Sequence, residues 1–105
     1  MKIIASLTTI PSRIRYIEPV LQSIIEQSLP PHEIHLQLPE ICQKEKEKYT
    51  IPSFLNAYPN ILVKRHPQDF GSASKWLFPL QYLSENSNIV LIIIDEDDRG
   101  VDQHN

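Results

Sequence analysis

The acidic residues Asp95 and Asp97 directly follow the most apolar run of the chain, residues 89–94. Two carboxylates at positions i and i+2 can converge on one hard divalent cation or, through that cation, on phosphate oxygens. If the apolar run is a buried strand, the charges must lie at the rim of its sheet. Composition alone is equally consistent with a solvated acidic loop.

A second candidate site lies in residues 69–75, Asp-Phe-Gly-Ser-Ala-Ser-Lys, between a predicted strand and a predicted helix. Gly71 permits a close backbone approach, and Ser72 or Ser74 can cap the helix. Together with Lys75, the amino end of the helix would favour an anion. The alternative is an ordinary capped helix with an exposed lysine.

A third candidate site is residues 8–13, Thr-Thr-Ile-Pro-Ser-Arg, after the first predicted strand. The hydroxyl of Thr8 and the guanidinium of Arg13 suit a nucleobase or a diphosphate. Pro11 prevents the strand from continuing, because proline donates no ladder hydrogen bond. A capped turn is the alternative.

The elements that position these residues can be read from the apolar spacing. Period-two or continuous apolar runs predict strands, and apolar residues at three- and four-residue steps predict helices. The predicted strands are residues 3–8, 33–38, 60–64 and 89–94, and the predicted helices are 17–29 and 72–85. Residues 40–49, rich in Lys and Glu, are predicted to form a solvated helix or a mobile connection.

Strands alternating with helices predict an α/β fold with about four parallel strands and helices on both faces. The run 89–94 is expected to be a central strand covered on both sides. Pro79 is expected to kink or split its helix, and Trp76 and Phe78 are expected in the core. All three candidate sites then lie at strand carboxyl ends, where α/β sheets bind ligands.

The chain resembles the N-terminal half of a GT-A-type glycosyltransferase. The resemblance is carried, in order, by Ala-Ser-Leu-Thr-Thr-Ile-Pro-Ser-Arg-Ile, Gln-Ser-Leu-Pro-Pro, Glu-Ile-His-Leu-Gln-Leu-Pro, Asp-Phe-Gly-Ser-Ala-Ser-Lys and Asp-Glu-Asp. It covers most of residues 3–97. It is closest to bacterial and viral polysaccharide-type enzymes and extends more loosely to glycosyltransferase family 2.

This resemblance implies a Rossmann-like nucleotide-sugar-binding subdomain over residues 1–97, followed by a polar tail at 98–105. It implies transfer of a sugar from a nucleotide-diphospho-sugar with Mn²⁺ or Mg²⁺ as the cofactor. Asp95 and Asp97 would be the ends of the metal-binding Asp-x-Asp motif. The nucleotide and its diphosphate would contact the remaining candidates, Thr8, Pro11, Arg13, Asp69, Gly71 and Lys75.

The tail departs from the family, because no acceptor-binding half follows Asp97. Three hypotheses result. The chain is a glycosyltransferase whose missing half is supplied by a partner or lost by truncation, a non-catalytic remnant that still binds nucleoside diphosphate and metal, or a decayed reading frame without a stable product. The sequence leaves the donor sugar, the base and the glycan or other acceptor unspecified.

Charge and composition restrict the partners. The formal net charge is −3, and five of the thirteen acids lie in the last eleven residues. The remainder is nearly neutral, which argues against nucleic acid or an anionic membrane as a partner. No segment reaches the roughly 20 apolar residues of a membrane span, and the single cysteine, Cys42, excludes an internal disulfide. The expectation is a cytoplasmic chain that self-associates through an unpaired strand edge.

Overall fold

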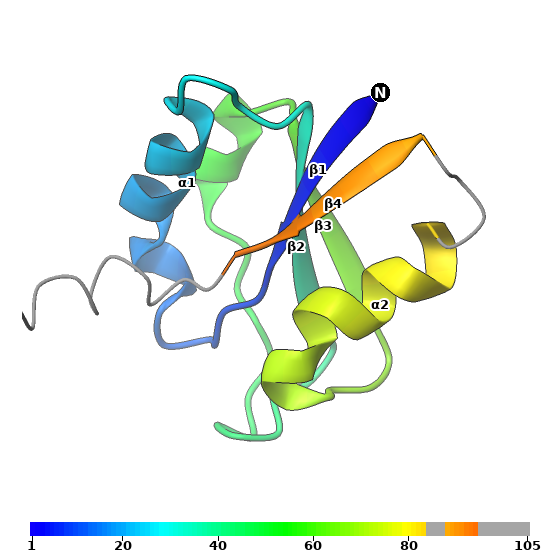
Figure 1. Cartoon of the computed structure of the whole chain (residues 1–105). Coiled ribbons are helices and arrows are strands. Elements are labelled where there is room, and N and C mark those ends of the chain that lie inside the picture. The colour runs from blue at the N-terminus through cyan, green and yellow to red at the C-terminus, as the bar shows by residue number, and fades with distance from the viewer. Residues whose placement is uncertain (84–87, 95–105) are drawn as a thin grey trace, which may run out of the picture.

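The computed structural model describes residues 1–83 and 88–94. Its centre is a four-stranded parallel sheet in the order β3-β2-β1-β4 (Figure 1). The strands are β1 (Lys2–Leu7), β2 (Glu33–Pro39), β3 (Ile61–His66) and β4 (Ile89–Ile93). The predicted α/β class with four parallel strands is therefore confirmed.

Two helices cover opposite faces of the sheet (Figure 1). Helix α1 (Glu18–Ile25) connects β1 to β2, and α2 (Ser74–Leu83) connects β3 to β4. Short 3₁₀ turns precede both helices at Ile14–Tyr16 and Gly71–Ala73, and a third forms at Ser53–Ala57. The crossovers lie on opposite faces because right-handed connections from β1 to β2 and from β3 to β4 run in opposite directions across the sheet.

The hydrophobic core lies between α1 and one face of the sheet. Alternate strand residues such as Leu7, Leu36 and Leu38 are fully buried there against Leu21 of α1. The opposite face also carries buried polar residues, Ser6, His35 and Gln37. Because successive strand side chains point to opposite faces, these polar residues lie on the side of α2.

The prediction that the run 89–94 is central was wrong. Strand β4 lies at the edge of the sheet and pairs with β1. Val90 and Ile92 remain 41% and 37% exposed. An apolar run predicts a strand, but it does not specify which neighbours the strand has.

The first helix is shorter than predicted. It ends at Ile25, and Leu29 is 72% exposed. The second helix begins at Ser74 after the 3₁₀ turn and continues through Pro79 to Leu83, so the predicted split does not occur. Phe78 is buried as expected, whereas Trp76 is 44% exposed, so its predicted place in the core was wrong.

Among the helices of the described residues, none has the length and apolar character required to cross a membrane.

Candidate functional site

A pocket of about 270 Å³ lies at the carboxyl edge of the sheet. The edge includes the point between β1 and β4 where the strand order changes direction, the usual ligand position in open α/β sheets. The wall is built by segments that follow all four strands: Thr8, Thr9, Ile10 and Arg13 after β1; Pro39, Cys42, Lys44 and Tyr49 at the end of β2 and beyond; Asp69, Gly71, Ser74 and Lys75 after β3; and Ile94 after β4.

Five residues proposed from the sequence lie in the wall of this one pocket: Thr8, Arg13, Asp69, Gly71 and Lys75. Pro11 does not line it. Pro11 instead belongs to the turn in which the N–H groups of Arg13 and Ile14 donate to the carbonyl of Ile10, at 2.9 and 3.0 Å. Pro11 therefore shapes the loop that carries Arg13.

The predicted metal ligands Asp95 and Asp97 lie outside the described residues. Asp95 is the next residue in the chain after Ile94, which lines the pocket. Within residues 1–83 and 88–94, no group of three or more His, Cys, Asp or Glu side chains could hold a metal ion.

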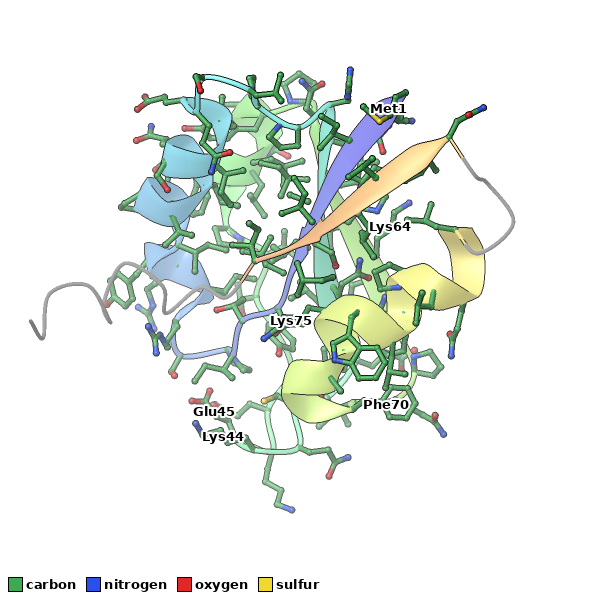
Figure 2. All side chains as sticks on the ribbon, viewed as in Figure 1. Met1, Lys44, Glu45, Lys64, Phe70 and Lys75 are labelled. Carbon is green, nitrogen blue, oxygen red and sulfur yellow. The ribbon has the colours of Figure 1, made fainter. Side chains whose placement is uncertain are left out.

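The charged side chains of the wall favour an anionic ligand. Arg13, Lys44 and Lys75 contribute three positive charges, and Asp69 contributes the negative charge among the lining residues. Figure 2 shows Lys75 near the start of α2, and Lys44 with Glu45 on the turn that follows β2. The amino end of α2 adds a partial positive charge, because Ser74 and Lys75 begin that helix.

Asp69 is already bonded to two backbone groups. One carboxylate oxygen accepts a hydrogen bond from the N–H of Gly71 and the other from the N–H of Gln43, both at 2.7 Å. Gly71 adopts the left-handed conformation, with φ +64°, which costs glycine little. Asp69 thus joins the segment after β3 to the segment after β2, a role that the sequence did not indicate.

The segment at 42–47 is a closed turn, not the predicted solvated helix or mobile connection. The N–H of Cys42 donates to the carbonyl of Glu47 at 2.8 Å, and the N–H of Lys46 donates to the carbonyl of Cys42 at 2.6 Å. The carboxylate of Glu45 accepts hydrogen bonds from the backbone N–H and the hydroxyl of Ser12. Glu45 and Asp69 therefore tie the loops after β1, β2 and β3 together.

Tyr49 and Cys42 form a buried part of the pocket that sequence reasoning missed. The Tyr49 hydroxyl donates to the backbone carbonyl of Thr9 at 2.6 Å. Burial, chiefly, and the neighbouring Cys42 raise the pKa of Tyr49 far above its ordinary value, so this side chain stays a neutral donor. In the sequence, Cys42 and Tyr49 stand out only as apolar residues at the two ends of the charged run 43–48.

The hydroxyl of Thr9 is a further feature that the sequence did not reveal. Among the buried side-chain oxygen and nitrogen atoms of the described residues, Oγ1 of Thr9 is the one that has no hydrogen-bond partner. Thr9 is 5% exposed and contributes to the pocket wall. Buried polar groups are normally paired, so this hydroxyl is an exception next to the cavity.

Comparison of the chain with protein-family models, with curated proteins and with solved structures found no match. The fold and the site place the chain in a broad class. It is an α/β chain with a four-stranded parallel sheet and, at the carboxyl edge of that sheet, a pocket lined by arginine and lysine side chains.

Proposed function

We propose that this pocket binds the diphosphate of a nucleotide and that the chain is the donor-binding part of a glycosyltransferase using a nucleotide-diphospho-sugar. One observation carries the proposal. Cationic side chains from the segments after three different strands line a single cavity, while the carboxylate of Asp69 is occupied by backbone N–H groups.

A diphosphate is the ligand that this combination of groups suits best. Lysine and arginine bind phosphate oxygens through short charge-assisted hydrogen bonds, and a helix amino end adds to the attraction. The apolar side chains of Ile10, Pro39 and Ile94 give the same cavity a surface for a ring. The volume of about 270 Å³ is slightly below the range of about 300–1,000 Å³ that is typical of ligand sites.

The resemblance of Asp-Glu-Asp to an Asp-x-Asp motif assigns Mn²⁺ or Mg²⁺ to Asp95 and Asp97 in this proposal. A cation there would act as a Lewis acid that stabilises the diphosphate as it leaves the sugar. Hard divalent cations prefer carboxylate oxygens and phosphates. Arg13, Lys44 and Lys75 would neutralise the remaining charge.

The test is pyrophosphate binding by Lys75→Met, measured by isothermal titration calorimetry. Methionine keeps the apolar stem but removes the charge, so affinity should fall by about tenfold or more, because a hydrogen bond to a charged group contributes about 1.5–3 kcal/mol. Lys64→Met is the matched control, since Lys64 lies on β3 and does not line the pocket. Equal affinity in the two variants would argue against a diphosphate at Lys75.

A further inference from the structure

One carbonyl in the first turn of α2 lacks its usual backbone hydrogen-bond donor. In an α-helix the carbonyl of each residue accepts from the N–H four residues later. For Lys75 that later residue is Pro79, which lies inside α2 and has no N–H. The carbonyl of Lys75 therefore cannot be paired in the ordinary way within its own helix.

A side chain of the sheet supplies the missing donor. The hydroxyl of Ser6 on β1 donates to the carbonyl of Lys75 at 2.6 Å. Ser6 is fully buried, at 0% exposure, and a buried carbonyl without a partner would be costly. Because Pro79 has no N–H, the carbonyl of Lys75 bonds to Ser6 instead, and this bond joins α2 to β1. Lys75 is also a residue that lines the pocket.

Two more side chains orient the Ser6 hydroxyl. Because a carbonyl can only accept, Ser6 uses its one hydrogen on Lys75, and its oxygen accepts from Nε2 of Gln37 at 3.1 Å. The side-chain oxygen of Gln37 then accepts from Nε2 of His66 at 2.7 Å. The ring of His66 stacks on Phe78 of α2, with the ring centroids 3.5 Å apart. The hydrogen bonds thus run from β3 through β2 and β1 to α2.

We propose that Ser6 is a positioning residue of the pocket, which fixes the backbone of Lys75 against β1 so that its ammonium group faces the loop at residues 8–13. This inference rests on the proposed binding of a diphosphate. Lysine has a long, flexible stem, so the position of its backbone determines which part of the cavity its charge can reach. Thr8 and Thr9, which line the pocket, follow Ser6 closely in the chain, directly after the end of β1 at Leu7.

If Ser6 had a purely structural role, a different experimental result would be expected. If Ser6 only pairs the carbonyl of Lys75, any other donor would replace it. Pro79→Ala provides such a donor, because alanine has an N–H and would present it at the correct helical position. The double variant Ser6→Ala/Pro79→Ala then pairs the carbonyl within the helix but leaves it unbonded to β1.

The experiment compares four proteins: the unchanged chain, Ser6→Ala, Pro79→Ala and the double variant. Urea unfolding gives the stability of each, and isothermal titration calorimetry gives its affinity for pyrophosphate. Ser6→Ala should be the least stable, and the double variant should regain stability. The affinity of the double variant should stay about tenfold below that of the unchanged chain, which corresponds to ~1.4 kcal/mol. Pro79→Ala alone should bind normally, since it keeps Ser6.

Two results would overturn the inference, and they are distinguishable. Full pyrophosphate affinity in the double variant would show that Ser6 only satisfies the carbonyl, while the proposed function stands. Failure of the unchanged chain to bind pyrophosphate would remove the proposed function together with the inference.

Discussion

At the scale of single residues, two carboxylates organise the loops around the pocket by accepting hydrogen bonds from them. Asp69 accepts the N–H groups of Gly71 and Gln43, and Glu45 accepts the N–H and hydroxyl of Ser12. Each bond joins segments that follow different strands or closes a turn in one of them. The positively charged residues Arg13, Lys44 and Lys75 are thereby held around one cavity.

Replacing Asp69 by alanine should lower the free energy of unfolding by about 1–2 kcal/mol, because two partly exposed hydrogen bonds to a charged acceptor are lost. Chemical denaturation with urea measures the change. Glu40→Ala is the control, since Glu40 is exposed and does not line the pocket. An Asp69→Ala protein as stable as the control would contradict the structural role of this carboxylate.

Site residues could be predicted where a short stretch of sequence indicates them, but not where they reach the pocket through contacts with distant parts of the chain. Thr8, Arg13, Asp69, Gly71 and Lys75 lie in the segments at or beyond the carboxyl ends of predicted strands, and the rule that ligands bind at these ends selected them. Tyr49 and Cys42 enter the pocket through a long-range bond to the Thr9 carbonyl and a closed turn. Nothing in the Lys- and Glu-rich sequence around them specifies those partners.

At the scale of elements, the sheet face beneath α2 is unusual because it buries polar side chains and carries two histidines. His35 on β2 bonds to Glu33 at 2.7 Å, and His66 on β3 bonds to Gln37. Burial, as the main cause, lowers the pKa of both histidines, and the charge of Lys64 acts in the same direction. Hydrogen bonding to Lys2 and to His35 lowers the pKa of Glu33.

These shifts predict that the chain loses stability in acid in two stages. A histidine with a lowered pKa binds fewer protons when folded than when unfolded, so stability decreases as the pH falls below 6.5, the ordinary value. Glu33 adds a further loss as the pH falls below 4.5. Urea unfolding between pH 7.5 and about pH 3 measures both stages, because the loss due to Glu33 is complete only below its lowered folded pKa.

The histidine stage can be assigned by substitution. In a His35→Gln/His66→Gln variant, the change in stability between pH 7 and pH 5.5 should become smaller, since neither position can then bind a proton. Lys48→Gln serves as the control, because it removes an exposed base and leaves every histidine in place. A pH dependence that is the same in the variant and the unchanged chain would contradict the assignment.

The type and sequence order of the elements were predictable, but their contacts were less so. Periodicity located four strands and two helices, and alternation predicted the parallel sheet. It did not reveal that β4 is an edge strand, because strand order depends on crossovers and not on local composition. Likewise, Pro79 could be recognised in the sequence as a disturbance of its helix. The hydrogen bond from Ser6 that replaces the missing donor could not, because it joins residues far apart in the sequence.

At the scale of the whole molecule, the edge strand β4 is the most exposed apolar element of the sheet. Val90, Ile92 and Ile93 are each more than a third exposed. Its five residues, Ile-Val-Leu-Ile-Ile, include neither a charge nor a proline, the features with which natural edge strands avoid pairing with other chains.

The chain is therefore expected to self-associate at micromolar concentration, and Ile92→Lys should reduce that association, because a charge on an edge strand disfavours pairing. Sedimentation velocity over a concentration series is the measurement. Tyr16→Lys is a control that removes an exposed apolar side chain away from β4, at 68% exposure. A monodisperse monomer of the unchanged chain at all concentrations would contradict this expectation.

Thermal unfolding against UDP, GDP, CDP and dTDP, with and without Mn²⁺, tests for a nucleotide-diphosphate site at the carboxyl edge of the sheet. A ligand at 100 times its Kd adds about 2.7 kcal/mol to the stability of the folded chain. We predict that one diphosphate raises the Tm, that Mn²⁺ increases the shift, and that Asp97→Asn removes the Mn²⁺-dependent part. A cooperatively unfolding chain whose Tm none of the four nucleotides changes would contradict the claim.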